Sequence, residues 1–181
     1  MALEDVTFKH PTKDQFELIY SWFAKPHVSE FFDDPETGRS IPDLLNYLSG
    51  KDYFFTPWLA CENDKPFAYI MTAEVKRHET GIWSKWREKK GKTYSMDMLI
   101  GDEAFLGKGM SHLLIKKFIA EHFQHAAAFL IDPELRNIHA IHVYEKAGFV
   151  IVDQFRGEHG RYAGIPHIMM KLKLSSDAVQ A

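Results

Sequence analysis

Leu106-Gly107-Lys108-Gly109-Met110-Ser111 stands where an apolar, strand-like stretch gives way to a helix-like one. Glycines let the backbone turn tightly and approach a ligand. The free N–H groups and positive dipole end of the following helix attract phosphate. The stretch is not a Walker A loop, because no Gly-Lys-Ser/Thr closes it, and it lacks the Rossmann spacing behind a first strand. It therefore predicts a pyrophosphate-binding loop, with an ordinary strand-to-helix turn as the alternative.

Apolar periodicity and turn residues on both sides of this loop predict alternating strands and helices. The expected strands are residues 6–9, 53–62, 67–74, 94–101, 126–131, 149–155 and 165–172. The expected helices open at Thr12, run from about 40 to 50, and cover 107–123 and 137–147. Thr12 and Gln15 have the spacing of a capping box, residues 63–66 form a turn, and Gly148 ends the last helix. The order βααβββαβαββ predicts an α/β fold with one mixed sheet of about seven strands flanked by helices.

The composition fits one globular domain. A chain of 181 residues with 45% hydrophobic content can bury a core without disulfides or metals. We expect a single domain over residues 1–174, a flexible tail over 175–181, and a buried, unreactive Cys61. The sequence shows neither the basic and apolar regions of a signal peptide nor an apolar run of about 20 residues, so we expect a cytoplasmic protein without a membrane span.

A second motif carries a family resemblance. Residues 132–149 read Asp-Pro-Glu-Leu-Arg-Asn-Ile-His-Ala-Ile-His-Val-Tyr-Glu-Lys-Ala-Gly-Phe, similar to the pattern Asn-x-x-Ala-x-x-x-Tyr-Glu-Lys-x-Gly-Phe. The glycine loop is similar to Arg/Gln-x-x-Gly-x-Gly/Ala, with Leu106 in the first position and Ser111 in the last. Both patterns belong to the GNAT superfamily, so the sequence resembles N-acetyltransferases that use acetyl-coenzyme A (acetyl-CoA). The resemblance implies the GNAT fold and these cofactor-binding residues: Leu99, Ile100, Leu106, Gly107, Lys108, Gly109, Met110, Ser111, Asn137 and Ala140.

The resemblance extends over nearly the whole chain to one branch of that superfamily. Val6-Thr7-Phe8, Tyr20-Ser21-Trp22, His27-Val28-Ser29-Glu30 and the interval 97–107 are similar to aminoglycoside 6'-N-acetyltransferases and to related acyltransferases of siderophore biosynthesis. The aminoglycoside enzymes tend to have Asp at position 97 and the siderophore enzymes His. Asp97 therefore favours transfer of an acetyl group to a primary amine of a small molecule, with the siderophore type as the alternative.

Four residues are candidates for chemistry at the acceptor and the thioester. An aliphatic amine of pKa about 10.4 is only ~0.1% deprotonated near pH 7.4, so a proton acceptor is needed, and Asp97 is that candidate. The resemblance makes Tyr144 the acid for the departing thiolate, Asn137 a contact of the pantetheine arm and Asp132 a contact of the acceptor. The alternatives are a solvated carboxylate, a core aromatic, a helix N-cap and a turn residue, respectively.

Residues 76–92 are locally basic. They contain seven Lys or Arg and two Glu, a charge of +5 in a chain of net charge −3. Within this segment Trp83 and Trp86 are candidates to stack on the acceptor, and the cations predict an acceptor less cationic than an aminoglycoside. A solvated charged loop is the alternative, and a non-catalytic coenzyme A sensor or basic interaction module is the rival function.

The remaining expectations concern partners. Histidines three apart on predicted helices lack an evident third ligand, so no metal site is expected. Net acidity argues against general nucleic-acid binding, and we expect a small-molecule amine substrate and a monomer or homodimer.

Overall fold

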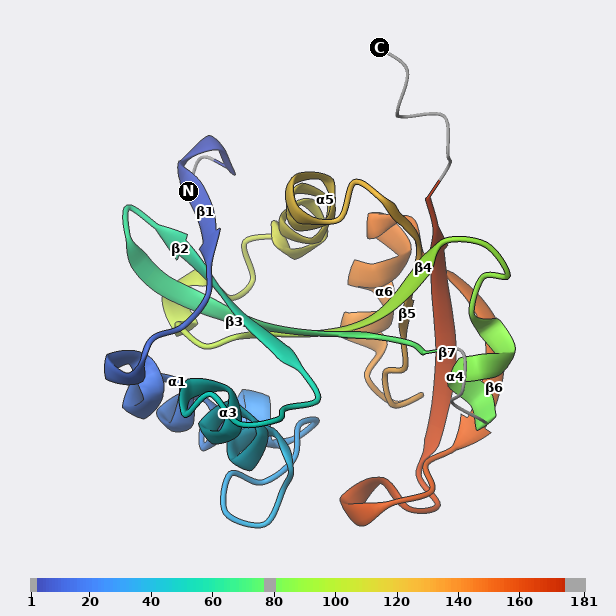
Figure 1. Ribbon diagram of the computed structural model, residues 1–181, viewed down its shortest axis with the longest axis horizontal. Coiled ribbons are helices and arrows are strands. Elements are labelled where there is room, and N and C mark those ends of the chain that lie inside the picture. Colours follow the sequence, from blue (N-terminus) through green and yellow to red (C-terminus); the bar gives the residue numbers. More distant parts are fainter. Residues whose placement is uncertain (1–2, 77–80, 175–181) are drawn as a thin grey trace. The chain divides into compact units, whose positions relative to one another are not determined.

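The computed structural model describes residues 3–76 and 81–174 (Figure 1). The predicted flexible tail lies outside the described residues. The strands are β1 Val6–Lys9, β2 Thr56–Glu62, β3 Lys65–Glu74, β4 Lys92–Ile100, β5 Ala126–Ile131, β6 Val150–Arg156 and β7 Pro166–Lys173. The α-helices are α1 Phe16–Phe23, α2 Pro26–Ser29, α3 Ser40–Leu48, α4 Gly81–Trp86, α5 Ser111–His122 and α6 Ile138–Ala147. Short 3-10 helices are η1 Leu3–Asp5, η2 Lys13–Gln15, η3 Glu103–Phe105 and η4 Gly160–Tyr162.

The strands form one mixed sheet in the order β1-β2-β3-β4-β5-β7-β6. β4 and β5 pair in parallel, whereas β1 with β2, β2 with β3, β5 with β7 and β6 with β7 pair antiparallel. The predicted mixed α/β fold of about seven strands is thereby confirmed. The residues fall into two compact units: the chain up to Ala73 with Asp97–Gly109, and Glu74–Met96 with the chain from Met110 onward. The single domain over 1–174 stays a prediction.

The core of the first unit joins α1 and α3 to the strands. Ile19 and Phe23 of α1 are fully buried, in a cluster with Leu44 of α3, Leu59 of β2 and Leu99 of β4. α1 and α3 lie on the same side of β2 and β3 (Figure 1). One face of α1 therefore packs into the core of this unit.

The entry to this helix and the next element differ in detail from the prediction. The amide N–H of Thr12 donates to Oε1 of Gln15 at 2.8 Å, as the capping-box spacing indicated, and the first turn is the 3-10 helix η2. The sequence analysis missed α2, which is only four residues long and begins at Pro26. So short an element leaves no periodic pattern to detect.

Two boundaries and one further element differ from the prediction. Hydrogen bonds explain the first boundary and backbone angles the second. β2 begins at Thr56 rather than at 53, because the Asp43 carboxylate accepts the N–H groups of Phe54 (2.6 Å) and Phe55 (2.7 Å). The β2–β3 turn is only Asn63-Asp64, both with positive φ, as in a two-residue hairpin. Residues 81–86, expected as loop, form the helix α4.

In the second unit the predicted α6 is confirmed and the predicted start of α5 is wrong. Asn137 caps α6, and Gly148, with φ 105°, ends it in the left-handed conformation. α5 begins at Ser111 rather than at Gly107, because Gly107 (φ 69°) and Gly109 (φ 67°) are left-handed and cannot continue a right-handed helix. Residues 107–110 therefore belong to the glycine loop and not to the helix.

Candidate active site

Asp97 lies on β4 in the first unit, between the buried residues Met96 and Leu99. Its side chain is half-buried, and burial raises the pKa of the Asp97 carboxyl to about 6. The negative charge of Asp33 acts in the same direction. The Asp97 side chain is therefore not fully exposed to solvent. A carboxylate with a pKa near 6 is a stronger base than an ordinary one and is still mostly ionised at pH 7.5.

Asp33 was missed by the sequence analysis. Its carboxylate accepts the N–H of Ser40 at 2.9 Å and the Ser40 hydroxyl at 2.6 Å, so it anchors the loop that leads into α3. Asp33 and Asp43 also raise the pKa of the buried Tyr69 phenol, after burial itself, which keeps Tyr69 neutral. The sequence Asp33-Asp34-Pro35 resembles an ordinary turn, and nothing in it indicates that Asp33 acts on a residue of β4.

The glycine loop follows β4 and the 3-10 helix η3. Phe105 stacks on Phe67 with ring centroids 4.3 Å apart, and the ammonium of Lys108 lies 5.5 Å from the Phe105 ring. Gly107 and Gly109 are exposed, and a Cβ at either position would have no heavy atom within 4 Å. Among the described residues no side chain caps the start of α5. Open backbone therefore precedes a twelve-residue helix, the arrangement that anions prefer.

The candidates around α6 lie in the second unit. The Asn137 side-chain oxygen accepts the N–H of Ala140 at 3.1 Å, so Asn137 is a helix N-cap. Tyr144 is buried on the same helix, with its ring 5.9 Å from that of Phe149. Asp132 is half-buried directly after β5. Leu99 and Ile100 lie on β4 within the first unit.

The basic segment is anchored rather than free. Trp83 and Trp86 of α4 pack against the cluster formed by Val75, Leu130 and Met169. The Trp86 indole N–H also donates to Oδ2 of Asp153 at 2.9 Å, which fixes the position of that ring.

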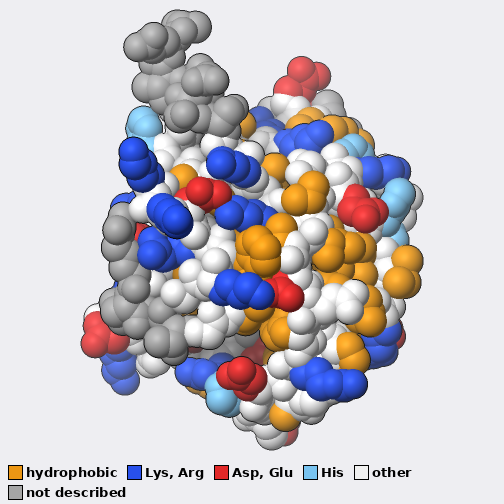
Figure 2. All heavy atoms as spheres, turned by 90° about the vertical axis from the view of Figure 1, so that its right-hand side faces the viewer, with side chains coloured by type: hydrophobic (Ala, Val, Ile, Leu, Met, Phe, Trp, Pro, Cys, Tyr) orange, Lys and Arg blue, Asp and Glu red, His pale blue; other side chains and the backbone are white. Residues whose placement is uncertain are grey.

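Several charges of this segment have partners in the same unit. Lys85 lies 2.6 Å from Asp153, whose carboxyl pKa falls to about 2 through hydrogen bonds from Lys85 and Trp86. Lys92 pairs with Glu74 at 2.8 Å. Figure 2 shows Lys and Arg side chains interspersed with acidic and apolar ones on the face that includes α4 and β6. The local field is thus weaker than the sequence charge of +5 indicated. Arg77 and Glu79 lie outside the described residues.

Neither a metal-binding cluster nor a membrane-spanning helix occurs among the described residues. Among residues 3–76 and 81–174, no three His, Cys, Asp or Glu side chains are grouped so that they could hold a metal ion. Over the same residues, no helix has the length and apolar character needed to span a bilayer.

The chain belongs to the GNAT acetyltransferase family. The family model described as an acetyltransferase (GNAT) domain matches residues 11–156, which confirms the resemblance read from the two motifs. The protein is an N-acetyltransferase that uses acetyl-CoA.

Three proteins to which the chain is similar are aminoglycoside acetyltransferases. The chain is 32% identical to an aminoglycoside N(6')-acetyltransferase of known structure from Legionella pneumophila, with a TM-score of 0.80 over 93% of this chain and 92% of the other. It is 26% identical over 151 residues to the aminoglycoside N(6')-acetyltransferase type 1 of Klebsiella pneumoniae, covering 81% of this chain and 74% of the relative. An aminoglycoside acetyltransferase solved with coenzyme A shares the fold, with a TM-score of 0.73, 22% identity and coverage of 93% and 94%.

Burial of Asp97 makes a prediction about stability. The folded-state pKa of about 6 lies above the unfolded value of about 3.9, so the charged form is disfavoured in the native state. The resulting cost to stability is absent below about pH 4 and complete above about pH 6. Asp97→Asn should therefore raise the free energy of unfolding at pH 7.5 by roughly 1–3 kcal/mol, and by less at pH 4.5, in urea titrations. The exposed Asp52→Asn is the control, and an equal gain at both pH values would contradict the burial argument.

Proposed function

We propose that this enzyme transfers the acetyl group of acetyl-CoA to a primary amine of an aminoglycoside-type amino sugar. The observation that supports this acceptor most strongly is the 32% identity, over 93% of the chain, to an aminoglycoside N(6')-acetyltransferase. The charge around Asp97 agrees with it, because the carboxylate of Asp33 is close enough to act on that of Asp97. A cationic acceptor is attracted by such a field.

The proposed reaction is direct attack in a ternary complex. Asp97 takes a proton from the bound ammonium, directly or through water, and the amine attacks the thioester carbonyl. Tyr144 gives its phenolic proton to the departing thiolate, and Asp132 contacts the acceptor. The phenol has an ordinary pKa of about 10 and the thiol of about 8.5, so the transfer depends on positioning.

The proposed cofactor contacts belong to β4, the glycine loop and α6. The backbone of residues 106–111 holds the pyrophosphate and Asn137 contacts the pantetheine arm. Leu99, Ile100 and Ala140 are further cofactor contacts. Support comes from the left-handed glycines, the open space around them and the uncapped start of α5.

The rival acceptor is a less cationic amine, as the charge of residues 76–92 predicts. Its support is weakened because Lys85 and Lys92 have acidic partners and both tryptophans pack against strands. A siderophore-type acceptor is a second alternative. The oligomeric state, monomer or homodimer, stays a prediction. A cytoplasmic location stays a prediction.

Gly109→Asp should raise the coenzyme A dissociation constant more than tenfold, because it places a negative charge where the pyrophosphate is proposed to bind. Isothermal calorimetry measures the change. Gly164→Asp is the matched control, since Gly164 also has a positive φ (78°) and open space around it but lies outside the loop. If Gly109→Asp bound coenzyme A as tightly as the wild type, the proposal that this loop binds the pyrophosphate would be wrong.

The pH dependence of kcat/KM tests Asp97. With Asp97 as base, kcat/KM for the amine should rise through about pH 6 and then level off, because the reacting pair is carboxylate and ammonium. Asp97→Asn should lower kcat/KM by about 10²–10⁴ at pH 7.5, and its rate should keep rising with pH toward the amine pKa of about 10. If kcat/KM of Asp97→Asn still levelled off near pH 6, a group other than Asp97 would be responsible for that pH dependence.

Thiol release with a panel of amines tests the acceptor class. We expect kcat/KM for kanamycin-type amines to exceed that for amino acid-like or acidic amines by at least about tenfold, and to fall with added salt. Lys89→Glu with Lys90→Glu reverses two exposed charges without touching the Lys85–Asp153 anchor, and should change the ratio less than about threefold. A higher kcat/KM for acidic amines in the wild type, lost in the double variant, would contradict the aminoglycoside-type acceptor and support the less cationic one.

A further inference from the structure

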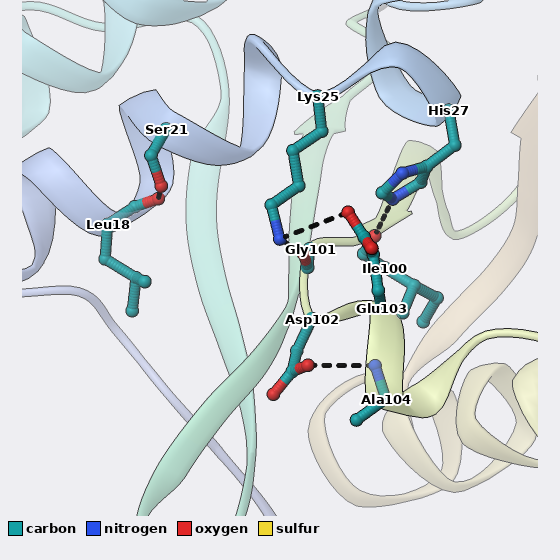
Figure 3. Close-up of polar contacts among 9 residues, drawn as sticks. All are labelled: Leu18, Ser21, Lys25, His27, Ile100, Gly101, Asp102, Glu103 and Ala104. Atoms are coloured by element: carbon teal, nitrogen blue, oxygen red, sulfur yellow. Dashed lines mark hydrogen bonds and ion pairs between the residues drawn. The ribbon is translucent and has the colours of Figure 1, made fainter.

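Two side chains, those of Lys25 just before α2 and of His27 in α2, bind the backbone at the end of β4 (Figure 3). Nε2 of His27 lies 2.9 Å from the carbonyl oxygen of Ile100. Nζ of Lys25 donates to the carbonyl oxygen of Gly101 at 2.8 Å and lies 3.8 Å from the Glu103 carboxylate. These contacts join residues 73 and 76 positions apart within the first unit.

The opposite side of the same backbone is held as well. The N–H groups of Gly101 and Asp102 both donate to the carbonyl oxygen of Phe67, at 2.8 and 3.0 Å. Gly101 lies against the buried indole of Trp22, and a Cβ there would come within 1.9 Å of a ring atom. Residues 100–102 are therefore fixed both through their N–H groups and through two consecutive carbonyls.

Lys25 and His27 are not part of the hydrophobic core of this unit, which is made by their neighbours Trp22, Phe23 and Val28. Both side chains are only half-buried. The Lys25 bond is charge-assisted, and such bonds are stronger and shorter than neutral ones. The two side chains therefore contribute more to fixing the direction of the β4 backbone than to burying apolar surface.

The position of this backbone matters for the proposed reaction. Asp97 lies just before it on β4, and the glycine loop begins just after η3, whose first turn Asp102 caps through the N–H of Ala104 at 2.9 Å. A change in the direction of residues 100–102 would move both the proposed cofactor loop and Ile100. Catalytic geometry tolerates little displacement, so groups that hold such a segment affect binding and rate.

We propose that Lys25 and His27 are positioning residues for acetyl-CoA, which hold the end of β4 in the direction that the cofactor requires. The proposal rests on the proposed function, because it takes Ile100 and the glycine loop as cofactor contacts. Neither side chain need touch the cofactor or the reacting atoms.

Two matched pairs of variants test it in the full-length chain. Lys25→Met and His27→Phe keep the shape of the side chain and remove the donor, whereas Lys25→Arg and His27→Gln keep an N–H donor. The control is Ser21→Ala, because the Ser21 hydroxyl bonds only to Leu18 of its own helix in the contacts drawn in Figure 3. For each variant we would measure the acetyl-CoA KM, the coenzyme A dissociation constant, the acceptor KM and Tm.

Loss of either donor should raise the acetyl-CoA KM and the coenzyme A dissociation constant about tenfold and leave the acceptor KM within about twofold. Lys25→Arg and His27→Gln should recover most of the affinity, and Ser21→Ala should match the wild type. If His27→Phe fails to fold, the Lys25 pair decides.

Unchanged cofactor affinity in Lys25→Met and His27→Phe, with wild-type turnover, would overturn the positioning role alone. Equal changes in both KM values together with a lower Tm would also overturn it, because that is general loosening of the unit. Failure of the wild type to bind coenzyme A would instead overturn the proposed function, and the positioning role with it.

Discussion

The backbone of residues 100–102 is paired on both sides. Phe67 accepts its N–H groups, and His27 and Lys25 bind its carbonyls. The backbone beyond the end of a strand is often solvated and free to bend, but this one is held by Phe67 near the start of β3, by Lys25 just before α2 and by His27 of α2. The direction of the chain beyond β4 is therefore set before the glycine loop begins, and the proposed cofactor site depends on it.

The same strand carries a carboxylate that is unfavourable for stability and useful for chemistry. Burial and the charge of Asp33 raise the pKa of Asp97 to about 6. An ordinary carboxylate is too weak a base to take a proton from an ammonium of pKa about 10.4, and each increase in its pKa reduces that gap. The remaining gap must be closed by holding amine and thioester together, which is why the fixed direction of β4 matters.

Local sequence patterns predicted the elements that local interactions decide. The strand β5, the N-cap Asn137 and the ending Gly148 follow from apolar runs, a capping side chain and a left-handed glycine, and they are confirmed. The start of α5 was wrong because glycine spacing shows that a turn exists and not how many residues it uses. α4 was missed because its charged and aromatic residues are typical of a solvated loop, whereas its tryptophans pack against strands distant in sequence.

The candidate site shows the same limit. The glycine loop could be proposed from a contiguous motif and Asp97 from the family resemblance, but the influence of Asp33 and the contacts of Lys25 and His27 join distant parts of the chain. The electrostatic effect of the charge on residues 76–92 was overestimated for the same reason, since the partner Asp153 lies far along the sequence.

Amide hydrogen exchange of the wild-type protein with and without coenzyme A measures the central claim most directly, which is that the backbone after the fixed end of β4 holds the cofactor phosphates. The account predicts that coenzyme A slows exchange of the amides in residues 107–112, with little change in the β2–β3 turn at Asn63 and Asp64. Binding of coenzyme A that leaves the amides of residues 107–112 unchanged while protecting another segment would contradict it.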